Sequence, residues 1–208
     1  MRKLIVTTVV LMTATWVCAS PLSMQFLAFQ SGGWQVGYPY TVSANGSGPI
    51  DVMCDDYEHG GAPGDAWLAN LTNLGSGNLS LLRFNQLPGA PTLYDEAGWL
   101  LLQTTVTPTS QWTDINFAVW YIFDSSVSLS PNAQYWLNLA QQEAQNGFPG
   151  VDFDRVGIYT PVNQYDPNMA DAQEFLRIVP EPDTLTLLCS GLVGALAIAQ
   201  RRIAKLKL

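Results

Sequence analysis

An apolar segment near the C-terminus, followed at once by basic residues, limits what this chain can fold into. The segment runs from Leu185 to Ala199, and no polar face interrupts it at helical spacing. It is shorter than the roughly 20 residues of an ordinary membrane helix, so an amphipathic or core helix is the alternative. The basic cluster behind it favours a membrane helix with a cytoplasmic tail. That cluster consists of Arg201, Arg202, Lys205 and Lys207.

The N-terminus has the features of a segment that is removed on export. Arg2 and Lys3 precede an apolar run, residues 4–12, and the short residue Ala19 closes the region. This pattern predicts a secretory signal peptide over residues 1–19, cut after Ala19. A lipoprotein signal that uses Cys18 is the alternative, but the three residues before that cysteine lack the small and leucine-type side chains that it requires.

The C-terminal region also carries a recognisable motif. Val179, Pro180, Glu181 and Pro182 come before the apolar segment, and Arg201 and Arg202 come after it. This order closely resembles the PEP-CTERM sorting signal of bacterial exported proteins. The resemblance implies cleavage near Pro-Glu-Pro by an exosortase, a membrane-embedded transpeptidase-like protease, in a Gram-negative bacterium that makes exopolysaccharide. The membrane helix within residues 179–208 would then anchor the chain transiently in the inner membrane before transfer to the cell surface or matrix.

Residues 20–178 remain as one exported domain, long enough to bury a core. Three arginines, no lysine and fifteen acids fall in this range, which gives a net charge of −12. Nucleic acid is excluded as a partner because phosphate contacts require Lys and Arg. Acidic polysaccharide would be repelled unless divalent cations bridge the two. Lys–Asn isopeptide cross-links cannot form in a domain without lysine.

Hydrophobic patterning predicts an α+β fold for this domain. A helix that starts with Ser130 as its N-cap and Pro131 at its first position, and that ends before Gly147, has the clearest limits. Two further helices are expected over residues 94–103 and 113–124, and the second is apolar nearly all round, so it must be buried. Strands are expected over residues 24–30, 34–44, 50–54, 155–162 and 174–179.

Cysteine usage singles out one residue of the exported domain. Cys18 leaves with the signal peptide and Cys189 lies in the apolar segment, so Cys54 has no partner for an intramolecular disulfide. A lone thiol in an oxidising compartment is open to oxidation. Cys54 is therefore a candidate for covalent chemistry, and the alternative is a buried thiol that packs as a small hydrophobe.

The surroundings of Cys54 are similar to those in the thioester domains of bacterial surface adhesins. The matching stretches are "MCDD" at 53–56, "YDEAGWLL" at 94–101 and "FAVW" at 117–120. In that family, a cysteine attacks a glutamine side-chain amide and forms an internal thioester. The resemblance implies an adhesin-like surface or matrix interaction protein, without enzymatic turnover or cofactor, and it makes Cys54 and Asn116 the candidate thioester pair.

Asn116 departs from the family pattern, which has glutamine two residues before Ala118. Its side chain is one methylene shorter, so its carbonyl carbon falls about 1.5 Å short of the usual place. Acyl transfer tolerates such a gap poorly. We therefore expect the fold to persist without the bond, and a shifted backbone that permits the bond is the alternative. Gln103 and Gln111 are substitute amides away from the matched position.

Other candidate sites are less specific. Cys54 and His59 could imitate a hydrolase dyad, but they lie in one loop, and no oxyanion-hole signature accompanies them. Two groups of acids could bind calcium through oxygen, but the stretch "DFDRVG" at 152–157 lacks the repeated acids and terminal glutamate of a loop-type calcium site. The acids of both groups are expected to be solvated, and no metal is predicted. These acids are Asp51, Asp55, Asp56 and Glu58, with Asp152 and Asp154 further along the chain.

Aromatic side chains in predicted loops give an alternative function. Trp34, Trp67 and Trp112 could stack on sugar rings, as a secreted glycan-binding module associated with exopolysaccharide would require. Packing into small apolar clusters is the other reading of the same three side chains.

Overall fold

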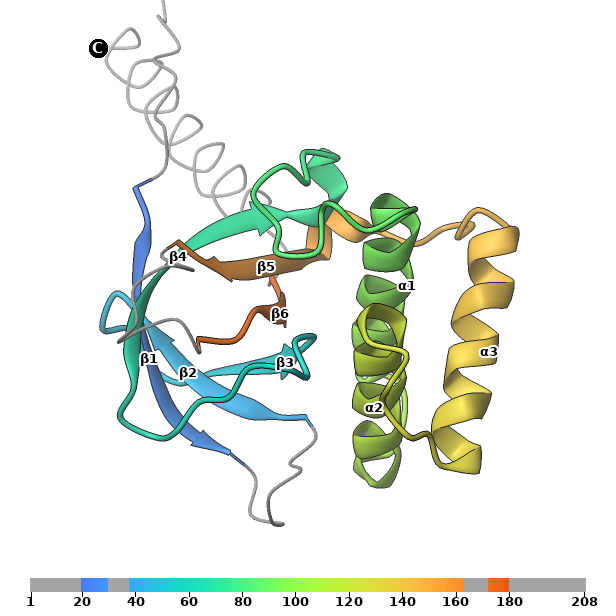
Figure 1. Ribbon diagram of the computed structural model, residues 1–208, viewed down its shortest axis with the longest axis horizontal. Coiled ribbons are helices and arrows are strands. Elements are labelled where there is room, and N and C mark those ends of the chain that lie inside the picture. Colours follow the sequence, from blue (N-terminus) through green and yellow to red (C-terminus); the bar gives the residue numbers. More distant parts are fainter. Residues whose placement is uncertain (1–19, 30–37, 163–171, 180–208) are drawn as a thin grey trace, which may run out of the picture.

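The computed structural model describes residues 20–29, 38–162 and 172–179. Within these residues, six strands close into one antiparallel barrel in the order β1-β2-β3-β6-β5-β4 (Figure 1). The strands are β1 (Leu22–Phe29), β2 (Tyr40–Ala44), β3 (Ile50–Cys54), β4 (Ala66–Asn73), β5 (Val156–Pro161) and β6 (Phe175–Ile178). Closure leaves no long strand edge exposed.

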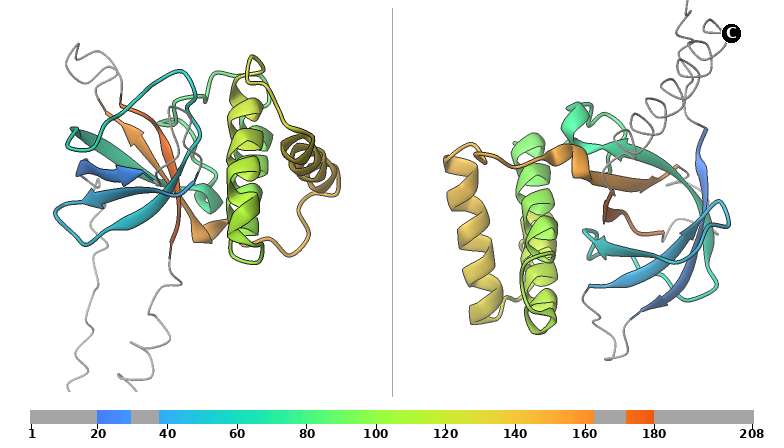
Figure 2. Two further views of the ribbon diagram at one scale, coloured as in Figure 1. Left: turned by 90° about the horizontal axis from the view of Figure 1, so that it is seen from below. Right: turned by 180° about the vertical axis from the view of Figure 1, so that it is seen from behind.

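Three helices form a layer on one side of this barrel. They are α1 (Ala90–Gln103), α2 (Trp112–Phe123) and α3 (Pro131–Gln145), and short 3-10 turns are η1 (Leu74–Ser76), η2 (Thr109–Gln111) and η3 (Phe153–Arg155). Helices α1 and α2 lie against the barrel, and α3 packs on their outer side (Figures 1 and 2). The α+β fold class predicted from the sequence is confirmed.

Local sequence explains the limits of the helices. The hydroxyl of Ser130 accepts a hydrogen bond from the Ala133 N–H at 3.0 Å, so the predicted N-cap of α3 is present. Helix α1 begins at Ala90 instead of residue 94, because Pro91 occupies its first turn. The acids expected in that first turn lie one turn further on, and Glu96 among them is buried.

Strand β4 is the element that the sequence did not predict. Trp67 and Ala69 point into the barrel, but Leu68 and Leu71 are exposed, so apolar residues occur on both faces. This pattern hides the alternation that marks a strand. Trp67 was expected in a loop, and that expectation was wrong.

Two apolar cores meet at the barrel wall. The first fills the barrel and includes Met24, Phe26, Val42, Val52, Cys54, Trp67, Tyr159 and Phe175. The second lies between the barrel and the helices and includes Met53, Leu100, Leu101, Ile115, Val119, Leu137, Ile158 and Leu176. Successive strand residues alternate between the two cores, as a pleated strand requires. Helix α2 contributes to both, because Trp120 packs with the barrel interior.

No helix within the described residues is long and apolar enough to cross a membrane. The predicted signal peptide, the predicted membrane helix, Pro180, Glu181, Pro182 and the basic tail lie outside the described residues. Val179 is described, and its main-chain N–H donates to the carbonyl of Arg155 at 2.7 Å. The start of the sorting motif therefore follows β6 directly.

Candidate functional site

Cys54 ends strand β3 and points into the barrel, where it is fully buried. Its thiol donates to the main-chain carbonyl of Asp56 at 3.1 Å. The sulfur also accepts from the Asp56 N–H at 3.4 Å. The sulfur is therefore held by the turn that follows its own strand.

The surroundings of this thiol oppose its ionisation. Burial raises the pKa of Cys54 well above its ordinary value, and the nearby carboxylates of Asp56 and Asp55 raise it further. Hydrogen bonding with Trp120 and with the Asp56 main chain acts in the opposite direction but is smaller. The thiol therefore stays protonated at neutral pH, and a protonated thiol is a poor nucleophile.

The structure brings Asn116 next to Cys54, but through the main chain. The Asn116 side-chain amide donates to the Cys54 carbonyl oxygen at 2.8 Å. Its Oδ1 atom accepts from the Tyr38 N–H, also at 2.8 Å. Asn116 is fully buried, so this polar group is satisfied at both ends. We call this arrangement the Asn116 bracket, because it ties helix α2 to the end of β3 and to residue 38.

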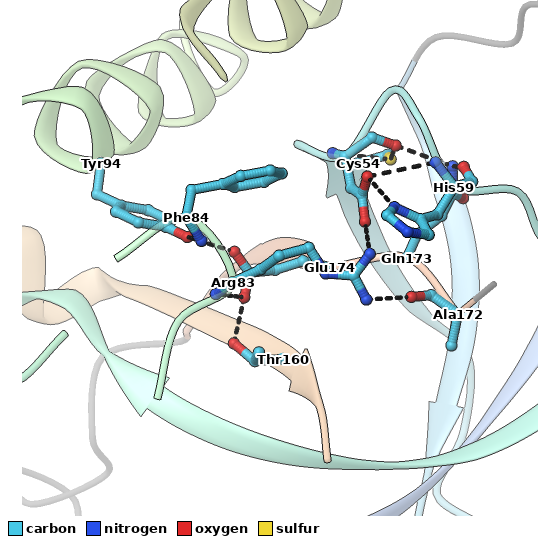
Figure 3. Close-up of polar contacts among 10 residues, drawn as sticks. Cys54, His59, Arg83, Phe84, Tyr94, Thr160, Ala172, Gln173 and Glu174 are labelled. Carbon is cyan, nitrogen blue, oxygen red and sulfur yellow. Dashed lines mark hydrogen bonds and ion pairs between the residues drawn. The ribbon is translucent and has the colours of Figure 1, made fainter. Parts of the chain in front are cut away.

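Asp56 is the centre of a second buried network, and Figure 3 labels its partners Arg83, His59 and Gln173. Its carboxylate is paired with the guanidinium of Arg83 and with His59 Nδ1, the latter at 2.8 Å. Arg83 also donates to the Ala172 carbonyl, and the Gln173 amide donates to the main chain of Asp56 and His59. The network joins the loop after β3 to the residues before β6.

Asp55 and Glu174 form a pair of buried carboxyl groups beside this network, and neither is exposed. Glu174 accepts hydrogen bonds from Tyr94, Thr160 and the main chain of Arg83 (Figure 3). Asp55 has no such donor, because neither of its carboxyl oxygens has a hydrogen-bond partner among the described residues. Both groups interact with Tyr94 of helix α1, Glu174 through a hydrogen bond and Asp55 through its charge.

Several sequence predictions need correction here. Asp55 and Asp56 were expected to be solvated, but both are completely buried because the chain folds back at residues 172–174 to cover them. The partner of His59 Nδ1 is the Asp56 carboxylate and not the Cys54 thiol, so the two residues do not form a Cys–His dyad.

Among the described residues, no cluster of three or more potential ligands could hold a metal ion.

The candidate glycan-stacking residues do not form a shared surface in the described chain. Trp67 is only 6% exposed and packs against Phe175 inside the barrel. Trp112 begins α2, packs edge-on against Tyr38 and donates from its indole N–H to the Thr107 carbonyl. Trp34 lies outside the described residues.

Arg83 and Glu174 are functional-site residues that sequence reasoning missed. Arg83 is one of only three arginines in the exported domain. The small number of arginines was the one sequence feature that could have pointed to a buried ion pair. Glu174 is the first residue of the strand predicted over residues 174–179, and it is an acid in a segment rich in apolar residues. Neither partner could be assigned, because both contacts join distant parts of the chain.

Comparison with solved structures finds similarity to bacterial thioester and adhesin domains at 12–14% sequence identity. The N-terminal thioester domain of the fibronectin-binding protein SfbI from Streptococcus pyogenes has a TM-score of 0.49 at 12% identity, covering 83% of this chain and 100% of that one. The thioester domain of a Clostridium perfringens surface protein has a TM-score of 0.45 at 14% identity, covering 76% and 98%. The N-terminal domain of the Streptococcus pyogenes pilus tip adhesin Cpa has a TM-score of 0.48 at 12% identity, covering 82% and 98%.

Sequence comparison identifies the C-terminal motif. No curated protein matches the chain. Residues 179–202 match the family model described as the PEP-CTERM protein-sorting motif. The chain therefore carries a PEP-CTERM sorting signal, which implies export, processing by an exosortase and transient membrane association on the way to the cell surface.

Proposed function

We propose that this protein is an adhesin-like surface or matrix interaction protein of a Gram-negative bacterium, which acts by non-covalent binding and without turnover. The sorting motif at residues 179–202 supports the location. The observation that carries the non-covalent part is the Asn116 bracket, in which the side-chain amide is bonded to the main chain of Cys54. Asn116 thus acts as a structural residue where thioester domains have a reactive glutamine.

Three features of the site support a free thiol. The Cys54 sulfur is bonded to the Asp56 main chain, so the turn holds it in place. The raised pKa of Cys54 keeps the group in its less nucleophilic form. The Asn116 amide already has a donor and an acceptor, so releasing it for acyl transfer would leave the Tyr38 N–H and the Cys54 carbonyl unpaired in the interior.

The charge of the exported domain limits its ligands. With three arginines against fifteen acids, it favours uncharged or cationic surfaces. An acidic exopolysaccharide would be bound only through divalent cations, so its binding should disappear when a chelator is added. A glycan-binding role based on Trp67 would require that side chain to leave the barrel core.

Surface attachment in wild-type and Cys54→Ala cells tests the proposal. We expect equal amounts of the two proteins on the cell surface. We also expect denaturant to release both proteins from their partners as single chains. Denaturant-resistant adducts formed by the wild type and lost in Cys54→Ala would contradict non-covalent binding. Replacing Glu181 by Ala tests the sorting step separately, because uncleaved chains should then accumulate in the membrane fraction.

The variant Asn116→Gln tests whether the shorter side chain of asparagine is what prevents a thioester bond with Cys54. The added methylene moves the amide carbon toward Cys54, so the sulfur could attack that carbon, the carbon–nitrogen bond would break, and the thiol proton would leave with ammonia. We expect a mass about 17 Da below the calculated value for this variant, with methylamine adding to the acyl carbon. Asn132→Gln, on the exposed face of α3, is the matched control.

A further inference from the structure

The strand ladder places Asp55 and Glu174 directly opposite each other. In the β3–β6 pair, Met53 faces Leu176 and Cys54 faces Phe175, so the next position pairs Asp55 with Glu174. The Asp55 N–H donates to the Glu174 carbonyl oxygen at 3.4 Å, which extends the ladder by this step. Two like charges directly opposite on one face of a sheet repel each other.

Within the described residues, neither Asp55 nor Glu174 forms an ion pair with a basic side chain. The two terminal nitrogens of the Arg83 guanidinium bind Asp56 and the Ala172 carbonyl. The hydrogen bond from Arg83 to the pair comes from its main-chain N–H, which donates to Glu174 at 3.0 Å. Two fully buried carboxylates with neutral donors alone cannot both be ionised, because each buried charge costs several kcal/mol when it is unpaired.

The donors are distributed unequally within the pair. The Tyr94 hydroxyl donates to Glu174 at 2.6 Å, and the Thr160 hydroxyl donates to its other oxygen. Neither oxygen of Asp55 receives a hydrogen bond from the described residues. A proton on Asp55 would let this carboxyl donate to the Glu174 side chain beside it. The charge therefore belongs on Glu174, which has the donors, and the proton belongs on Asp55.

We propose that Asp55 and Glu174 share one proton across the end of the β3–β6 ladder, and that this proton is a pH-sensitive lock between the barrel and helix α1. Tyr94 comes from α1 and Thr160 from β5, so the pair connects three elements. Strand β6 leads directly to Val179, the first residue of the sorting motif. The lock therefore also holds the strand from which that motif departs. This inference does not depend on the proposed adhesive function.

The charged and titratable groups around the pair support the assignment. Asp56 lies on the same turn, with Arg83 and His59 as its partners, and Cys54 precedes it. Burial raises the pKa of Asp55, and the charges of Glu174 and Asp56 raise it further. Burial also raises the pKa of Glu174, while bonds from Thr160, Tyr94 and Arg83 oppose that shift. Tyr94 keeps its proton, because burial and Glu174 raise its pKa as well.

The direction of the pH dependence follows from these shifts. In the unfolded chain, both carboxyls lose their protons near pH 4. The folded pair keeps its proton to higher pH, so its contribution is complete below pH 4 and is lost as the pH rises through the folded-state pKa. Across that interval, the folding equilibrium constant falls by up to about tenfold per pH unit.

Asp55→Asn tests the lock in the full-length chain purified in mild detergent. The Asn amide can donate to Glu174 without a titrating proton, so the ratio of wild-type to variant folding constants should fall as the pH rises from about 4 through the folded-state pKa of the pair. Infrared difference spectra over the same pH range should show a carboxyl in the wild type that stays protonated above the usual range for Asp and Glu, and Asp55→Asn should lack it. Asp51→Asn, an exposed position on the same strand, should follow the wild type in both measurements.

Parallel pH profiles for the wild type and Asp55→Asn would overturn the proposal, as would the absence of the carboxyl band. If Asp55→Asn does not accumulate as folded protein, Glu174→Gln replaces it. That variant leaves Asp55 as the only carboxyl of the pair, with an amide donor facing it. Because the charge of Glu174 is then gone, Asp55 should lose its proton at a lower pH than in the wild type, and an unchanged pH for the loss of the infrared band would contradict the shared proton.

Discussion

Asp55 and Asp56 are neighbours in the chain and both are completely buried, yet the fold neutralises them by different means. Asp56 is paired with Arg83 and His59. Asp55 faces only another carboxyl, Glu174, and has no hydrogen-bond donor from the described residues. One carboxylate is therefore balanced by a fixed cation, and the other by a proton that depends on the solution.

This difference follows from the position of each side chain. Asp55 lies opposite Glu174 in the β3–β6 ladder, and the hydroxyls of Tyr94 and Thr160 donate to Glu174 rather than to Asp55. Asp56 lies in the turn beyond the strand, where Arg83 can reach it and where His59 remains partly exposed. A domain with only three arginines can balance few buried acids with cations, so one acid retains its proton.

Removing the Arg83 guanidinium should lower the free energy of unfolding more than any of the other changes. Arg83→Met keeps much of the side-chain volume but leaves the buried Asp56 carboxylate without its guanidinium. We expect the free energy of unfolding to fall by about 3–5 kcal/mol, measured by urea denaturation at pH 7. Arg155→Met is the control, because Arg155 forms no ion pair within the described part of the chain. Equal effects of the two variants would contradict the role of Arg83.

Removing a neutral donor from the proton-dependent pair should have an intermediate effect. Tyr94→Phe leaves Glu174 with one donor fewer and the Phe84 N–H without its acceptor. The expected loss is about 1–3 kcal/mol in the free energy of unfolding. Because the ionised form loses a donor, the pair should also hold its proton to higher pH. Urea denaturation at several pH values measures both effects, and the exposed Tyr135→Phe should show neither.

Removing His59, the partly exposed partner of Asp56, should change the free energy of unfolding least. The His59 side chain is 34% exposed, so solvent already screens its interaction with Asp56. We expect His59→Gln to change the free energy of unfolding by at most about 1 kcal/mol. A loss as large as that of Arg83→Met would mean that the histidine, rather than the arginine, balances Asp56.

Much of the fold could be predicted from local patterns. The N-cap at Ser130 and the apolar run of α2 identified their helices, and alternation identified β3. Strand β4 could not be found this way, because its exposed Leu68 and Leu71 mask the alternation. Barrel closure depends on the pairing of β4 with β1 and β5, which no local pattern encodes.

The candidate site was predictable only in part. The resemblance to thioester domains pointed to Cys54 and Asn116 as a pair, and in the structure the Asn116 amide donates to the Cys54 carbonyl oxygen. Which atoms meet could not be read from the sequence, since one methylene decides whether the amide reaches the sulfur or the main chain. The buried state of Asp55 also depends on Glu174, more than one hundred residues away in the chain.

The intact mass of the exported wild-type chain, before and after methylamine, tests the central claim most directly. We predict a mass equal to the sequence value, unchanged by the amine, with a Cys54 thiol that alkylates only after denaturation. A mass about 17 Da lower, with methylamine added on treatment, would show that ammonia had left and a thioester had formed. That result would replace the Asn116 bracket by a covalent bond and contradict non-covalent binding.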